Sequence, residues 1–128
     1  MLVPALLALA LAPAVAACGG DDGGALAGSS AGGTDAVAGE RVFEERGCTS
    51  CHSVTGDSST GPHLDGIVGT EVEVQGGETV AVDDAYLERS IREPRSQVVD
   101  GFDPIMPSID LSDDEVAALV AYIASLSD

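Results

Sequence analysis

The sequence predicts a small all-α domain interrupted by one short β-hairpin, and three observations carry that prediction. Apolar residues recur at helical spacing in three segments, 36–46, 84–92 and 112–126. Residues 71–82 instead alternate around two adjacent glycines, the usual pattern of a hairpin. A length of 128 residues suits one such domain together with extra segments.

Each predicted helix has recognisable ends. Thr34 or Asp35 caps the first helix, and Gly39 inside it indicates a close crossing by another helix; a merely tolerated glycine is the alternative. Asp83 caps the second helix, which Pro94 ends because the residue before proline avoids helical angles. The last helix opens with a capping box and carries one apolar stripe: Ser112-Asp113-Asp114-Glu115, then Val116, Leu119, Val120, Ile123 and Leu126.

The charge balance is strongly acidic. Twenty-two Asp and Glu residues against five basic residues give a formal charge of −17. That balance excludes nucleic acid as a partner, since phosphate needs basic contacts, and it excludes electrostatic docking to anionic lipid. An electrostatic protein partner should present a basic docking surface. Adaptation to high salt is the alternative explanation of the acidity.

The most informative motif is Cys48-Thr49-Ser50-Cys51-His52. Cys-x-x-Cys-His is the attachment signature of haem c: two thiols bind one edge of the porphyrin covalently, and the imidazole ligates the iron. A disulfide, a thioredoxin-like pair and half of a zinc site are the alternatives. Zinc would need a second pair of ligands, and only Cys18 and His63 remain outside the motif. We therefore expect one covalent haem c.

A second iron ligand has two candidates. Met106 lies on a proline-stiffened loop far along the chain, and His with Met is a standard axial pair for electron-transfer haem; a core-filling methionine is the alternative. His63 is the weaker candidate, because a loop histidine beside a proline is usually solvated. The turn-rich stretch 61–69 offers apolar residues to line a haem pocket, and a carbonyl there is expected to accept the His52 ring N–H.

The first 34 residues have a different composition from the rest. Residues 1–17 form an apolar run that is read as an export signal, although no basic residue precedes it and the true start is therefore open. Cys18 follows a lipobox-like Val-Ala-Ala and is predicted to be lipidated; an unmodified cysteine is the alternative. The rest of 18–34 is predicted to be a flexible Gly/Ala/Ser/Asp tether, and 35–128 the folded domain.

Residues 35–128 resemble class I cytochromes c, most of all the small cytochrome c domain fused to subunit II of some haem–copper oxidases. The resemblance rests on the haem motif, Gly61-Pro62-His63-Leu64, the stretch Tyr86 to Pro94, and Met106-Pro107 before the terminal helix. It implies that the first and last helices cross with the haem in the middle, at Gly39, Phe43 and Tyr122. It also implies that His52 and Met106 are axial ligands, and that the Pro62 carbonyl accepts from His52 while Leu64 belongs to the haem pocket. The copper-binding part of subunit II is absent from this sequence.

These observations predict a monohaem electron carrier rather than an enzyme. We expect Cys18 to anchor it on the outer, periplasmic face of the bacterial cytoplasmic membrane. Membrane respiratory complexes, an oxidase or a quinol–cytochrome reductase, are the expected partners. A haem enzyme or sensor with an open sixth iron position, a fixed haem subunit of a larger complex and a scaffold without haem are the alternatives. Arg89, Arg92 or Arg95 are expected to pair with the haem propionates, solvated surface charges being the alternative.

Overall fold

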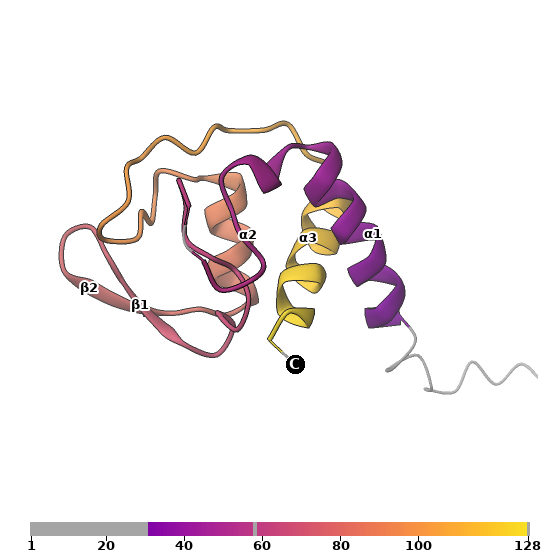
Figure 1. The fold of residues 1–128 in the computed structure, drawn as a ribbon, viewed down its shortest axis with the longest axis horizontal. Coiled ribbons are helices and arrows are strands. Elements are labelled where there is room, and N and C mark those ends of the chain that lie inside the picture. Colours follow the sequence, from indigo (N-terminus) through magenta and orange to yellow (C-terminus); the bar gives the residue numbers. More distant parts are fainter. Residues whose placement is uncertain (1–30, 58, 128) are drawn as a thin grey trace, which may run out of the picture.

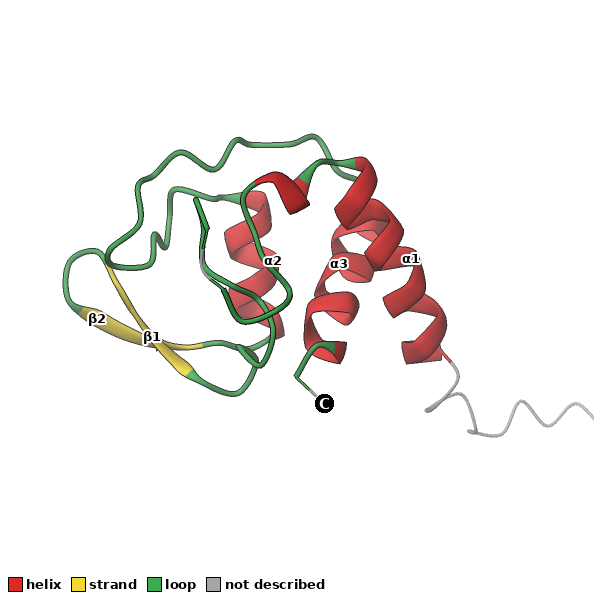
Figure 2. Ribbon diagram, in the orientation of Figure 1, coloured by secondary structure: helices red, strands yellow, loops and turns green. Residues whose placement is uncertain are grey.

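The computed structural model describes residues 31–57 and 59–127, and Figures 1 and 2 show how their elements are arranged. The helices are α1 (Ala31–Glu45), α2 (Asp84–Arg92) and α3 (Asp113–Ser125), with a short 3₁₀ turn at Cys48–Ser50. Strands β1 (Glu71–Val74) and β2 (Glu78–Ala81) form a two-stranded antiparallel sheet. The fold is therefore helix-rich with one small sheet.

Helices α1 and α3 lie side by side and cross at a glycine (Figure 1). A Cβ atom on Gly39 would overlap the Ala118 carbonyl and would lie 2.7 Å from Tyr122 Cβ. Close to the crossing, the rings of Phe43 and Tyr122 pack with centroids 5.5 Å apart and planes inclined by 57°, a tilted arrangement that aromatic quadrupoles favour. The predicted close crossing is confirmed, because only glycine leaves room for it.

The hydrophobic core lies between the three helices. The stripe predicted for α3 is confirmed: Val116, Leu119, Val120 and Ile123 are buried, and Leu126 packs against the core from the end of the helix. Burying an aliphatic side chain of this size stabilises a fold by about 1.5–3 kcal/mol, so this stripe is what holds α3 in place. The other buried members of the core are Val42, Phe43, Leu64, Val82, Tyr86, Leu87 and Tyr122.

The predicted ends of α2 and α3 agree with the structure. The Asp83 side chain accepts a hydrogen bond of 2.8 Å from the backbone N–H of Tyr86, and α2 ends at Arg92, two residues before Pro94. At α3, Ser112 Oγ accepts from the N–H of Glu115, and the Glu115 side chain accepts in return from the N–H of Ser112. Both caps are formed by residues close in sequence, which is why the sequence predicted them.

Two local predictions are wrong. Helix α1 begins at Ala31, so Thr34 and Asp35 lie inside it rather than capping it. Extending a helix that is already nucleated adds a hydrogen bond for each residue fixed. The helix therefore extends toward the N-terminus beyond Thr34 and Asp35, as far as Ala31. The hairpin turn contains three residues rather than two, because Val74 pairs with Glu78 and leaves Gln75 outside the strand.

Candidate functional site

The Cys-x-x-Cys-His motif follows α1 directly and folds into one compact turn. Gly47 adopts a left-handed conformation, with φ of 76°, and turns the chain out of α1. The N–H groups of Cys51 and His52 then both donate to the Cys48 carbonyl, over 3.2 and 3.0 Å. Both thiols are half-buried and are not joined in a disulfide. Burial raises the pKa of Cys48, so an unmodified Cys48 is a neutral thiol.

The His52 ring is held by the segment that follows the motif. Its Nδ1 donates to the Pro62 carbonyl over 2.9 Å, which leaves Nε2 as the ring atom with a lone pair to offer a metal. The Gly61 N–H donates to the Cys51 carbonyl over 2.8 Å and brings the chain against the imidazole. A Cβ atom on Gly61 would lie 2.7 Å from His52 Cε1. The predicted hydrogen bond to Pro62 is confirmed.

The motif lines a cavity of about 350 Å³ with mostly apolar walls. One side of the cavity is formed by residues 43–64, which we call the His52 wall, and another by residues 86–111, the Met106 wall. Leu119 and Ile123 of α3 close the cavity between these walls. Pro62, Leu64 and Met106 line the cavity as expected, whereas His63 is not among its lining residues.

The Met106 wall is supported by the hairpin. The N–H of Gln75 donates to the Val98 carbonyl and its side-chain amide to the Phe102 carbonyl, both over 2.8 Å. The N–H of Asp100 donates to the Glu73 carbonyl over the same distance. An isolated two-stranded hairpin is marginal in water, so this contact stabilises the hairpin and the loop together. In Figure 1 the orange loop runs from this contact over the molecule to α3.

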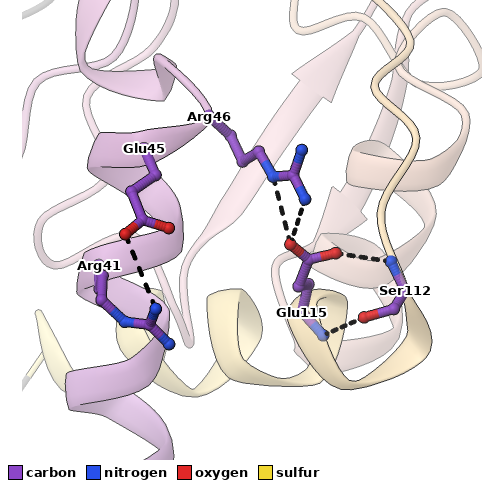
Figure 3. A network of polar contacts seen from close by, with 5 residues as sticks. All are labelled: Arg41, Glu45, Arg46, Ser112 and Glu115. Atoms are coloured by element: carbon purple, nitrogen blue, oxygen red, sulfur yellow. Dashed lines mark hydrogen bonds and ion pairs between the residues drawn. The ribbon is translucent and has the colours of Figure 1, made fainter.

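Glu115 joins the two walls (Figure 3). One of its carboxylate oxygens accepts from Arg46 Nε and Nη2, over 3.2 and 2.5 Å, and the other accepts from the Ser112 N–H over 2.8 Å. Arg46 lines the cavity on the His52 wall, and Ser112 directly follows the Met106 wall. Hydrogen bonds from the Arg46 side chain, and then from the Ser112 backbone, hold the pKa of Glu115 below its ordinary value.

The arginines expected to pair with haem propionates lie elsewhere. Arg92 contacts Glu88 over 3.0 Å and Asp113 over 2.8 Å, and Arg89 lies 3.8 Å from Glu93. None of Arg89, Arg92 and Arg95 is among the described residues that line the cavity. The expectation is wrong for Arg89 and Arg92, whose guanidinium groups pair with nearby carboxylates, and Arg95 does not line the cavity either. Arg46 is the arginine at the cavity.

The residues around the cavity fit a covalently bound haem. Ligand sites of this kind occupy about 300–1,000 Å³ and are mostly apolar with a few placed polar groups. Here two thiols, one imidazole nitrogen and one thioether sulfur belong to the lining of a single cavity. Cys18, by contrast, lies outside the described residues. No helix in the described ranges is long and apolar enough to cross a membrane.

Comparison with known proteins identifies the family. The model of the cytochrome c family matches residues 36–127, and the chain therefore belongs to that family. Cytochromes c carry covalent haem c through a Cys-x-x-Cys-His motif, which is present here as Cys48 to His52. The chain is also 37% identical over 89 residues to cytochrome c oxidase subunit 2 of Alkalihalophilus pseudofirmus. That match takes in 69% of this chain and a quarter, 25%, of the relative.

Three features of the site were not predicted from the sequence. Gly61 could have been suspected from its place beside Pro62, but only the fold shows that it contacts the His52 ring. The Arg46–Glu115 ion pair spans 69 residues and has no local signal. Ser90 lies in the stretch that carries the resemblance and Gln97 follows it, but neither was predicted to line the cavity on the Met106 wall.

Proposed function

We propose that this cytochrome c carries single electrons between membrane partners, with His52 and Met106 as the axial ligands of its iron. The observation that supports this most is the shared cavity of the two thiols, the imidazole and the thioether. Haem c, when bound, supplies reversible one-electron exchange at its iron. The protein's part is to fix the ligands and to keep water away from them.

Each ligand has a defined task in this proposal. The hydrogen bond to Pro62 fixes the His52 tautomer and raises the basicity of Nε2. Met106 supplies a thioether, which favours the reduced state more than a second imidazole would. Leu64 is buried and, with Leu119 and Ile123, lowers the local dielectric around the site. Neither ligand needs to move when the charge on the iron changes, so electron exchange is fast.

The setting of the domain is part of the same proposal. Cys18 is lipidated and anchors the protein to the outer face of the bacterial cytoplasmic membrane, on the periplasmic side, after removal of residues 1–17. The segment that follows tethers the domain, and tethering raises its effective concentration near membrane partners. A formal charge of −17 favours a redox partner with a basic docking surface, through a small and transient interface.

The first test is an optical spectrum of the exported holoprotein, oxidised and reduced, with added carbon monoxide. We expect a low-spin haem c that does not bind carbon monoxide and shows the weak far-red band of a sulfur–iron(III) bond. A Met106→Ala variant should lose that band and bind carbon monoxide. A wild-type protein that binds carbon monoxide readily would instead indicate an enzyme or sensor with an open iron position.

A fixed haem subunit of a larger complex is the second candidate function. It is favoured by the relative from Alkalihalophilus pseudofirmus, which is a cytochrome c oxidase subunit. Solubilised membranes distinguish the two candidates, because a free carrier separates from the oxidase on gel filtration whereas a fixed subunit co-elutes with it. Replacing Cys18 by Ser tests the anchor independently, since the variant should move to the soluble periplasmic fraction with an unchanged spectrum.

A further inference from the structure

Gln75 holds the loop that carries Met106 at two points. Its backbone N–H donates to the Val98 carbonyl, and its side-chain amide donates to the Phe102 carbonyl, each over 2.8 Å. Val98 and Phe102 line the cavity, but Gln75 itself does not. Gln75 is exposed and lies in the hairpin turn, outside both strands. A residue outside the cavity therefore fixes two residues of its wall.

The course of the backbone explains why a side chain is needed at Phe102. Val99 pairs with Val74 of β1 in an antiparallel bridge. Gly101, with φ of 85°, then turns the chain, and the Phe102 carbonyl lies beyond this turn. No backbone N–H group of the residues that the structure describes donates to that carbonyl. The hydrogen bond at this point of the loop therefore depends on the amide of Gln75.

Beyond Phe102 the loop has few restraints until it reaches α3. The Ile105 N–H donates to the Asp103 carbonyl over 2.8 Å, which is a contact within the loop. The next hydrogen bond along the chain is at Ser112, in the cap of α3. Among the hydrogen bonds of the described residues, the one at Phe102 is thus the last that a distant part of the chain makes before Met106.

We propose that Gln75 is a positioning residue for Met106, an inference that rests on the proposed ligation of the iron by Met106. To leave the iron, the thioether must move together with its loop. A loop that is fixed at Phe102 has fewer conformations available to it than a loop that is free there. Segments with few restraints open at the lowest cost in free energy. Loss of the Gln75 donor therefore lets other ligands replace Met106 more readily.

The test measures how readily imidazole displaces Met106 from the oxidised holoprotein, with loss of the far-red band as the signal. Gln75→Leu and Gln75→Glu both remove the donor at similar side-chain size, and the first adds no charge. In each, the apparent Kd for imidazole should fall about threefold to tenfold, the factor that one hydrogen bond contributes to an equilibrium. Gln75→Lys restores a donor and should bind imidazole almost as weakly as the wild type.

Thr79→Val is the matched control, because Thr79 is exposed on β2, which pairs with β1 and not with the loop. Circular dichroism checks that every variant is folded during the titration. Tighter imidazole binding in Gln75→Leu and Gln75→Glu, but not in Thr79→Val, would support the proposal. Binding like that of the wild type in both, or an equal change in Thr79→Val, would refute the role of Gln75 and leave the proposed function intact. A wild type without the far-red band would instead refute ligation by Met106, and this inference with it.

Discussion

The two walls of the cavity are held in different ways. Around His52, short hydrogen bonds join neighbouring parts of the same wall: Gly61 to Cys51, Leu64 to Ser53, and the imidazole to Pro62. In the Met106 wall, hydrogen bonds to the hairpin hold the loop as far as Phe102. From Met106 to Leu111, no backbone–backbone hydrogen bond holds the loop in the part of the chain that the structure describes. His52 is therefore held more firmly than Met106, and if both ligate the iron as proposed, stress should release Met106 before His52.

The largest effect is expected where both walls depend on the same support, the crossing of α1 and α3. A Gly39→Val variant places a branched side chain against the Ala118 backbone, which cannot move without displacing α3. We expect it to lose about 3 kcal/mol of stability and to weaken both walls together. Chemical denaturation of the holoprotein, followed by circular dichroism and by the far-red band, measures this loss.

The control for that variant lies in the same helix. Gly33 has open space around it, so Gly33→Ala should be neutral or should stabilise the protein by about 0.5–1 kcal/mol. Equal stabilities of the two glycine variants would contradict the close crossing.

The next effect is confined to the His52 wall. In a Gly61→Ala variant the new methyl group would lie 2.7 Å from His52 Cε1 and 3.0 Å from Nδ1. The ring must rotate or shift, and its hydrogen bond to Pro62 weakens. We expect a loss of about 1–3 kcal/mol together with altered proton NMR shifts of the His52 ring. Gly33→Ala is the reference for adding a methyl group elsewhere. If the His52 shifts of the Gly61→Ala variant are unchanged, the His52 wall is less rigid than we infer.

The smallest effect is expected from the ionisation of Glu115, which joins the two walls only while its carboxylate is charged. Because the pKa of Glu115 is lower in the folded state than its ordinary value of 4.5, its ionised form stabilises the fold. That contribution is complete above pH 4.5 and is lost as the pH falls through the lowered pKa. A Glu115→Gln variant should lose the far-red band at a higher pH than the wild type, because its Met106 wall is no longer joined to Arg46 by a charged pair.

The difference in stability between the Glu115→Gln variant and the wild type should also narrow at low pH, because Glu115 of the wild type is then protonated and uncharged. Glu45→Gln is the control, since Glu45 forms an exposed ion pair with Arg41, at 3.7 Å (Figure 3), and acts on Arg46 through its charge but not through a hydrogen bond. An acid transition that is identical in all three proteins would mean that Glu115 does not join the walls.

Local chemistry made parts of this molecule predictable. The start of α2 at Asp83 and the capping box of α3 depend on residues within one helical turn, and both agree with the structure. The start of α1 does not follow its local cap residues, because propagation of the helix outweighs them. The pairs Arg92–Asp113 and Arg46–Glu115 join distant segments of the chain, and for that reason Arg92 was misjudged and Arg46 missed.

Helix α1 also fixes a distance. Its 15 residues extend for about 22 Å, with the haem motif beyond its last turn and residues 1–30 joined to its first. Whatever holds the amino-terminal segment is thus separated from the haem motif by a rigid rod. With Cys18 in a membrane, α1 would hold the haem motif one helix length beyond the end of the predicted tether, within reach of partners that extend above the lipid surface.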